Sequence, residues 1–575
     1  MGRLCVKYTI RICGEAGQGI QTTGEGFSRL FSSLGYNVFS FQDYESRIRG
    51  GHNFYQISFS TEEVYAPKKF LDLVLTFDKK GLEYKNLLSD EGIVIYDANS
   101  LKQSESDERF VNCPFREMLK DAGLKNIFEN VVSFALVSNI FSIDKKYVYK
   151  VIQDIFSDKS EDILEQNMKA IDIGYNFEMK KKIDLPSSNN ESKILLDGVK
   201  GIGIGAIGSG CKFYAAYPMT PSTGVFQYMG ANAEKFNIVV EQAEDELSAI
   251  NMTLGASFAG VRAMTGTSGG GFALMNEALS LSGMTETPIV ILLSQRPGPA
   301  TGFPTRTEQG ELLYAINAGH GDFPRVVFAP GDPLECALLT NKAFDISEKY
   351  QIPAIVLTDQ HLVDSLCSYE KDLKIDLQNQ DYRLRSAEFE SYQDYKRHKF
   401  LDFSKNNPLY PLAVPGDSRQ LVFTDSDEHD EEGHITEDGE VRKKQLERRY
   451  FWKIENIRKE ISPPKIYGNK NSKIVLVGFG SNLGILREIA NNKKLSICAI
   501  HYSELFPLPL RENSEEALNN ILNAYVTICI ENNASGQFQK LIESEYRFKF
   551  SNNIRKFDGR PFNYDEVLEG IYAII

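Results

Sequence analysis

The chain has 575 residues, 42% of them hydrophobic and 25% charged, which is ordinary for a globular protein and too long for one hydrophobic core. Its formal net charge of −14 argues against a nucleic-acid partner, because such proteins carry a basic face over the phosphates. No apolar run approaches the roughly 18 residues of a membrane span, and the first residues lack the apolar core of a signal peptide, so we expect a cytoplasmic protein without membrane contact.

The first predicted elements form an α/β domain over residues 1–185. A strand over 4–13 leads into the glycine loop GEAGQG, a helical pattern follows, and a second strand covers 37–41, which predicts a strand–helix–strand opening. The loop has the spacing G-x-x-G-x-G rather than the dinucleotide-binding G-x-G-x-x-G. We interpret it as a tight strand–helix turn; a NAD site, with Asp43 at a suitable distance, is the alternative.

A second α/β domain is predicted over residues 194–375. Residues 186–193, rich in serine and asparagine, read as the linker that precedes it. Five glycines between 201 and 210 favour close helix packing over phosphate binding. Strands are expected at 213–216, 237–240, 261–265, 288–293, 325–329 and 353–358.

The pattern weakens over residues 376–470, which we expect to be an irregular connector. Its acidic run, DSDEHDEEGHITEDGE, has two interpretations: a solvated loop, or a metal site that uses His429 and His434. The basic run at 442–453 is expected to begin a helix and to neutralise the acidic loop. A third α/β domain is predicted over 471–575, where strand, turn and helix patterns return.

The most informative motif is Tyr-Pro-Met-Thr-Pro-Ser-Thr, which begins at Tyr217 directly after a predicted strand. Its two prolines fix the backbone and present Thr220, Ser222 and Thr223 at the carboxyl end of that strand, where ligands bind in open α/β sheets. A proline-stiffened turn whose hydroxyls cap the next helix is the alternative.

This motif is similar to the hallmark of the pyrimidine-binding domain in 2-oxoacid:ferredoxin oxidoreductases. Further segments resemble the same family in the same order, at 241–279, 294–312, 320–332, 428–438 and 531–537. The N-terminal domain, with GEAGQG and SRIRGGHNF, resembles the family's gamma domain fused in front. The resemblance covers nearly the whole chain. It implies several open, mostly parallel α/β domains, including a thiamine-diphosphate pyrimidine-binding domain and a transketolase C-terminal-like domain.

The resemblance also implies an activity. As a fused gamma/alpha-type subunit, the chain would take part in the coenzyme A-dependent oxidative decarboxylation of a 2-oxoacid with reduction of ferredoxin. Two segments resemble the subfamily that often uses 2-oxoglutarate, which would yield succinyl-CoA and CO2. Pyruvate or a branched-chain 2-oxoacid is one alternative. A non-catalytic scaffold subunit that kept the fold is the other.

The family divides its cofactors between subunits. The eight cysteines contain no C-x-x-C pair, and no G-D-G motif occurs in this chain. The resemblance therefore implies a beta subunit that carries Mg²⁺, a [4Fe–4S] cluster and the diphosphate end of a shared thiamine diphosphate. We expect a heterodimer, or a dimer of heterodimers, that is active only with the beta subunit and has ferredoxin, coenzyme A and a 2-oxoacid as its other partners.

Thiamine diphosphate needs a buried acid on its pyrimidine ring, and Glu246 aligns with the family's activating glutamate. Glu244 and Asp245 are the alternatives; three acids at a helix start also favour the helix dipole. The resemblance places Tyr217, Pro218, Thr220 and Glu246 at the cofactor.

A 2-oxoacid carboxylate needs a cation and hydroxyl donors. Thr220 and Arg306 match the family's substrate-binding positions, and Arg296 is a second candidate whose alternative role is a structural ion pair. Arg47 and Arg49, together with His52, are expected to contact coenzyme A phosphates or the partner subunit.

Overall fold

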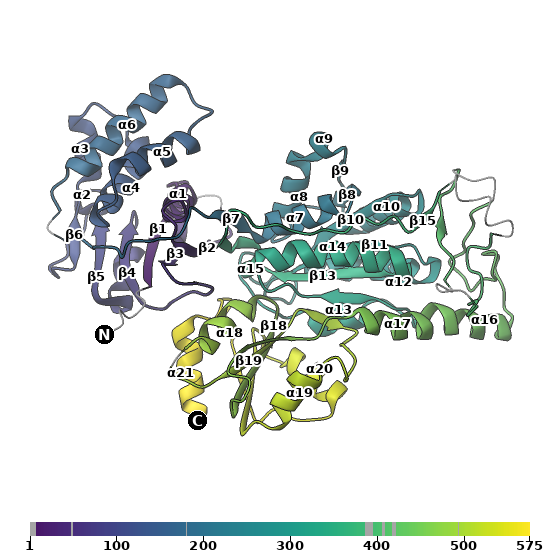
Figure 1. Ribbon diagram of the computed structural model, residues 1–575. Coiled ribbons are helices and arrows are strands. Elements are labelled where there is room, and N and C mark those ends of the chain that lie inside the picture. The colour runs from purple at the N-terminus through teal and green to yellow at the C-terminus, as the bar shows by residue number, and fades with distance from the viewer. Residues whose placement is uncertain are drawn as a thin grey trace. The chain divides into compact units, whose positions relative to one another are not determined.

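A computed structural model describes residues 7–47, 50–179, 181–385, 395–404, 409–416, 421–492 and 494–575. The chain folds into two compact units (Figure 1). The first comprises Met1–Leu196, Asp364–Leu373 and Asn563–Glu569, and the second Asp197–Val363, Lys374–Phe562 and Gly570–Ile575. Among the described residues, no helix combines the length and the apolar character that crossing a membrane requires.

The first unit is built on an eight-stranded mixed sheet in the order β6-β5-β4-β1-β3-β2-β14-β7. The strands are β1 (Tyr8–Ala16), β2 (Asn37–Asp43), β3 (Gly50–Ser60), β4 (Leu71–Thr76), β5 (Leu88–Tyr96), β6 (Phe110–Asn112), β7 (Ile194–Asp197) and β14 (Leu366–Tyr369). The predicted strand–helix–strand opening is present as β1, α1 (Ile20–Ser33) and β2. However, β3 lies between the two strands and pairs antiparallel with both.

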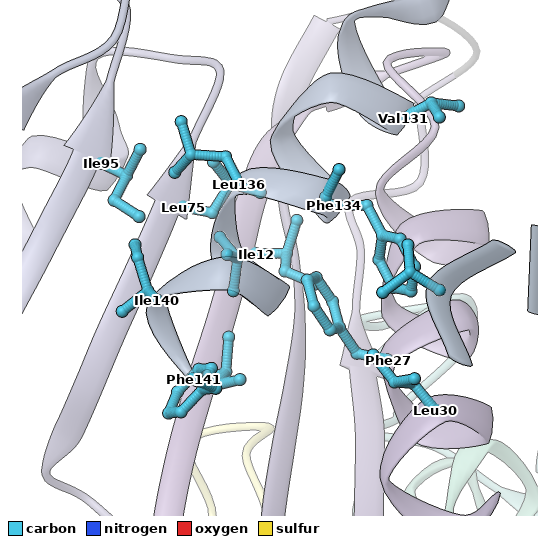
Figure 2. Close-up of a cluster of buried hydrophobic side chains, with 14 of the residues drawn as sticks. Ile12, Phe27, Leu30, Leu75, Ile95, Val131, Phe134, Leu136, Ile140 and Phe141 are labelled. Carbon is cyan, nitrogen blue, oxygen red and sulfur yellow. The ribbon is translucent and has the colours of Figure 1, made fainter. Parts of the chain in front are cut away.

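Helices α1, α4 (Glu129–Ile140), α5 (Lys145–Ile155) and α6 (Glu161–Asn176) contribute to the core of this unit. Strand alternation sends Ile12 of β1 and Leu75 of β4 into this core, where they join Phe27 and Phe134 from the helices (Figure 2). The rings of Phe27 and Phe134 are 4.3 Å apart between centroids. The period-two pattern of the strands thus faces α4, which is buried continuously from Val131 to Ser138.

The second unit contains a seven-stranded sheet in the order β20-β12-β13-β11-β10-β8-β9. Its strands are β8 (Cys211–Ala216), β9 (Val239–Gln242), β10 (Arg262–Thr267), β11 (Ile289–Gln295), β12 (Val326–Phe328), β13 (Pro353–Asp359) and β20 (Glu504–Phe506). All pairings are parallel except that of β12 with β20. The carboxyl ends of β8, β10, β11 and β13 therefore share one edge. The predicted α/β class is confirmed.

Both faces of this parallel sheet are covered, as parallel sheets require. Val290 and Leu292 of β11 face a core shared with α7 (Gly198–Gly208), α8 (Thr223–Ala231) and α14 (Pro333–Tyr350). The alternate residues, such as Ile291, face α10 (Glu246–Phe258), α12 (Asn276–Thr285) and the C-terminal sheet. The glycines of α7 serve packing, as predicted, because a Cβ at Gly201 or Gly205 would overlap the backbone of α14.

The C-terminal sheet has the order β17-β19-β18-β21-β22. It comprises β17 (Lys465–Gly468), β18 (Ile474–Phe479), β19 (Cys498–Tyr502), β21 (Val526–Glu531) and β22 (Asn552–Arg555). All of its pairings are parallel except that of β17 with β19. Helices α18 (Leu483–Ala490), α19 (Glu515–Leu522) and α20 (Gln537–Tyr546) belong to the same region, and α20 contributes Phe538 to a core that also contains Phe479 and Ile291.

The connector between these sheets is more ordered than the sequence suggests. It carries a short parallel pair, β15 (Arg383–Leu384) and β16 (Leu412–Ala413), before the acidic run. The predicted helix at the basic run is confirmed: α16 (Gly439–Leu446), a π-helical turn and α17 (Lys453–Glu460) follow one another (Figure 1). Arg442 and Arg449 of this segment pair with Glu428 of the acidic run.

Candidate active site

The turn after β8 carries the proline motif. Its Thr220–Pro221 peptide is cis, and Tyr217 is 41% exposed. Arg296, the first residue after β11, donates a hydrogen bond from Nη1 to the carbonyl oxygen of Thr220 over 2.7 Å. The Ser222 hydroxyl donates to the Met219 carbonyl and makes no capping bond to α8, which leaves the capping alternative without support from that residue. The turn is therefore tied to the carboxyl end of β11, at the edge predicted to bind ligands.

Glu246 opens α10 and is only 3% exposed. Its Oε1 atom is buried and has no hydrogen-bond partner in the described part of the chain. The carboxyl group rests on Gly271, where a Cβ would overlap it, and beside Thr267 at the end of β10. The two alternatives differ: Asp245 caps α10 by accepting from the Ser248 amide at 2.7 Å, and Glu244 is exposed. Of the three acids, only Glu246 presents a buried, unpartnered oxygen.

A second carboxyl group, that of Glu311, contacts the same glycine segment. Glu311 precedes α13 (Leu312–Asn317), and its backbone amide donates to Gln295 Oε1 at 2.9 Å. A Cβ at Gly269 would lie 2.5 Å from Glu311 Oε1, and the Oε2 atom is buried without a partner. The pKa of Glu311 is raised to about 8, chiefly by burial and then by the charge of Glu308, while Arg296 opposes the shift. Glu311 was not predicted from the sequence, where the only indication of its role is its position directly before an apolar helix.

The loop that contains Arg306 is fastened to the C-terminal sheet. Gln309 donates from its backbone to the Asn532 carbonyl at 2.7 Å and from Nε2 to the Phe479 carbonyl at 3.1 Å. The Thr307 amide donates to the Gly559 carbonyl at 3.2 Å. Arg306 itself is partly exposed, and a Cβ at Gly559 would lie 3.1 Å from its Cβ. The structure thus joins Arg296 to Thr220 directly, whereas Arg306 stands farther along the same loop.

The basic residues of the first unit are arranged differently from the expectation. Arg47 has a 67% exposed side chain and pairs with Glu45 at 3.1 Å, while Arg49 lies outside the described residues. Both ring nitrogens of His52 are engaged, Nδ1 with Asp78 at 2.7 Å and Nε2 with the Tyr84 hydroxyl at 2.6 Å. His52 is thus committed to an internal network rather than presented to a phosphate.

The two histidines of the acidic run do not form one site. His434 is exposed, with Nδ1 3.9 Å from Asp430 and 3.8 Å from Glu432. His429 is fully buried; its ring lies 4.0 Å from that of His398, and its Nδ1 contacts the Asp427 carbonyl at 2.9 Å. The predicted metal site is therefore not supported, and the solvated-loop interpretation fails for His429, because this side chain is part of a core.

That core is organised around Glu286, which is fully buried at the end of α12. Atoms of Glu286, His398 and His429 lie within 4.8 Å of one another, close enough to suggest a metal. However, Arg448 and Lys453 already pair with both carboxylate oxygens, and His398 Nδ1 donates to Glu286 Oε1 at 2.9 Å. Burial alone would raise the pKa of Glu286, but Arg448 and Lys453 lower it well below its usual range. A metal would have to displace these cations, so the group is a charge network.

Comparisons with known proteins identify the family. A family model of pyruvate flavodoxin/ferredoxin oxidoreductase, thiamine diphosphate-binding, matches residues 204–448, and one of pyruvate ferredoxin/flavodoxin oxidoreductase matches residues 9–177. The alpha subunit of a 2-oxoacid:ferredoxin oxidoreductase from a Sulfolobus species is 31% identical, over 98% of this chain and 96% of that protein. The 2-oxoglutarate synthase subunit KorA of Archaeoglobus fulgidus is 38% identical over 37% of this chain and 68% of its own length.

A solved structure extends the likeness to the whole fold. The 2-oxoglutarate:ferredoxin oxidoreductase from Magnetococcus marinus, with 2-oxoglutarate, coenzyme A and succinyl-CoA bound, has a TM-score of 0.88 and 27% sequence identity. It covers 99% of both chains. The turn at Thr220 and the buried acid at Glu246 thus lie within the part matched by the thiamine-diphosphate-binding model. The chain belongs to the 2-oxoacid:ferredoxin oxidoreductases, as an alpha subunit of that oxidoreductase family.

Proposed function

We propose that this chain is the alpha subunit of an enzyme that oxidatively decarboxylates 2-oxoglutarate to succinyl-CoA and CO2, with ferredoxin as the electron acceptor. The observation that carries the proposal is the buried, unpartnered carboxyl oxygen of Glu246 in the part of the chain matched by the thiamine-diphosphate-binding model. The bound ligands of the Magnetococcus marinus structure and the name of the KorA relative favour 2-oxoglutarate over pyruvate or a branched-chain 2-oxoacid.

The residues present fit the pyrimidine end of thiamine diphosphate. A buried polar atom without a partner costs about 1–3 kcal/mol unless a ligand or water satisfies it, and Glu246 Oε1 is such an atom. Gly271 leaves the carboxyl group uncovered where a side chain would displace it. When bound, the cofactor supplies the nucleophilic carbon that attacks the 2-oxo group. Glu246 would hold and return the proton on the ring's N1′, and Tyr217, Pro218 and Thr220 would line its pocket.

The substrate carboxylate is proposed to bind at Thr220 and Arg306. Arg296 is already engaged through Nη1 with the Thr220 carbonyl, so its first task is to hold the turn. Arg306 stands on the loop that Gln309 anchors to the C-terminal sheet, and a guanidinium can take a carboxylate with two parallel hydrogen bonds. Coenzyme A is proposed to approach the first unit near Arg47.

A beta subunit is proposed to complete the site with Mg²⁺ and a [4Fe–4S] cluster. The seven cysteines among the described residues form no disulfide, and all but Cys367 are buried, which supports placing the cluster elsewhere. Large apolar side chains remain exposed near the candidate site, as interfaces usually show. They include Val239, Leu247, Met252, Leu274 and Phe303. The assembly would be a cytoplasmic heterodimer or a dimer of heterodimers.

The experiment compares this chain alone with the chain co-expressed with its beta subunit. Alone, we expect no 2-oxoacid oxidation and no stoichiometric iron or sulfide. The pair should reduce ferredoxin or a viologen dye in the presence of coenzyme A, with the highest kcat/KM for 2-oxoglutarate in a panel that includes pyruvate and branched-chain 2-oxoacids. A higher kcat/KM for pyruvate would reassign the substrate. Iron and activity in the isolated chain would overturn the division between subunits, and a pair inactive on the whole panel would favour the scaffold alternative.

A further inference from the structure

Glu311 is half-buried as a residue, yet its carboxyl group is enclosed in a way that the fold alone does not explain. One carboxyl oxygen rests on Gly269 at the start of α11 (Gly269–Leu274), and the other is enclosed without a hydrogen-bond partner. The residue is not loosely placed, because its amide is fixed to Gln295 and the preceding residue is held by Gln537, which donates to the Gly310 carbonyl at 2.5 Å. A positioned acid with an unsatisfied oxygen is expected at a ligand site rather than in a structural core.

The charged groups that face Glu311 are Arg296 at the end of β11 and Glu308 on its own loop. The other elements against it present neutral groups, Gly269 from α11 and Gln295 from β11. The charge of Arg296 lowers the pKa of Glu311, and the charge of Glu311 raises that of Arg296, but no ion pair within 4.0 Å joins these two residues. The guanidinium instead points a hydrogen bond at the Thr220 carbonyl. Arg296 is therefore hydrogen-bonded to the turn and also interacts electrostatically with Glu311.

We propose that Glu311 is a positioning residue that acts through Arg296: its carboxyl group retains a proton and so leaves the charge of Arg296 uncompensated beside the Thr220 turn. The inference rests on the proposed function, in which this turn receives the carboxylate of a 2-oxoacid. An ionised Glu311 would compete for Arg296 and add a negative charge near the substrate. A protonated Glu311 does neither, which favours binding of an anion.

The first test uses the full chain without partner or cofactor. Burial raises the pKa of Glu311 to about 8, above the value near 4.3 of an unfolded glutamate. An acid whose pKa is higher in the folded than in the unfolded protein stabilises the fold fully at pH values below its unfolded pKa. This stabilisation is lost as the pH rises through the folded pKa. Glu311→Gln cannot ionise, so its Tm should rise relative to wild type between about pH 5 and about pH 8 and run level above. Glu277→Gln, at an exposed acid of α12, is the control and should show no such change.

The second test uses the assembled pair. The kcat/KM of the wild type for the 2-oxoacid should fall about tenfold per pH unit above the Glu311 titration, mainly through KM. This fall in kcat/KM at high pH should be absent in Glu311→Gln. If Glu311 were merely structural, the substitution would lower activity at every pH and leave the fall, the alkaline limb of the profile, in place. Glu311→Asp, which withdraws the carboxyl group from Gly269 toward solvent, should keep the limb and move it to lower pH.

The two tests separate the possible failures. A wild-type pair that oxidises no 2-oxoacid would refute the proposed function, and the unfolding comparison would still decide whether Glu311 holds a proton. A constant Tm difference across pH, or a kcat/KM limb unchanged in Glu311→Gln, would overturn the role of Glu311 even in an active enzyme.

Discussion

Glu286 and Glu246 are both buried carboxylates of the second unit, yet their surroundings are opposite. Glu286 is fully enclosed, and its two oxygens meet Arg448, Lys453 and His398. Glu246 is almost as enclosed, and its Oε1 has no hydrogen-bond partner among the residues that the structure describes. Burial alone therefore does not distinguish a functional acid from a structural one.

The difference lies in whether the chain satisfies the charge itself. A buried ion pair with complete hydrogen bonding belongs to the fold, and removing one partner leaves a costly uncompensated charge. An acid whose partners are missing destabilises the fold and persists where a ligand supplies them. By this criterion the Glu286 network holds the connector to α12, while Glu246 and Glu311 mark the face of the glycine segment where we propose that ligands bind.

The largest expected effect is on folding stability, at Glu286, whose charge is paired within the chain. Glu286→Gln should lower the stability of the second unit by about 3–5 kcal/mol, because Arg448, Lys453 and the nearby Arg397 would remain buried without their anion. Urea unfolding of the full chain, followed by near-UV circular dichroism, measures the loss. Combining Glu286→Gln with Lys453→Met should recover part of the stability, since one stranded cation is removed. An unaltered unfolding midpoint would show that the network is not structural.

Glu246→Gln should have the opposite result, with stability nearly unchanged and catalysis strongly reduced. Because Oε1 has no partner to lose, the variant should fold and assemble with a Tm equal to or slightly above that of wild type. Its catalytic rate in the assembled pair should fall by at least ~10²-fold, since an amide cannot exchange the proton that a general acid–base residue must carry. If Glu246→Gln kept full activity and Glu244→Gln lost it, the activating acid would be Glu244, despite its exposure.

Arg306→Lys should have the smallest of the three effects. The substitution keeps the charge and loses the planar fork that binds a carboxylate with two bonds. A damaged charge-assisted contact of about 1.5–3 kcal/mol corresponds to a roughly 10- to 100-fold loss in kcat/KM for the 2-oxoacid. Steady-state kinetics of the pair measure it, with Tm as the control for folding. Unchanged kinetics would move the carboxylate role to Arg296.

Local patterns anticipated much of the fold and part of the site. Strand alternation and the proline signals located the strand that carries the Thr220 turn, because these depend on residues near in sequence, whereas Glu246 was selected through the family resemblance and the small-residue helix that it opens. The same patterns did not show that β3 separates β1 from β2, or that β7 and β14 join the sheet of the first unit. Strand order depends on pairing between distant segments, which no local period encodes.

The sequence by itself determined the α/β class, the proline turn and the candidate Glu246 at the start of a small-residue helix. Only the tertiary structure decided which acidic side chains have ion-pair or hydrogen-bond partners. His429, Arg448 and Lys453 belong to charged runs of the sequence, yet they surround Glu286, and nothing in the sequence singled out Glu311, whose carboxyl group lies against Gly269. The physical reason is that the state of a charged side chain depends on its desolvation and on partners that are often more than a hundred residues away, as Glu286 is from Arg448.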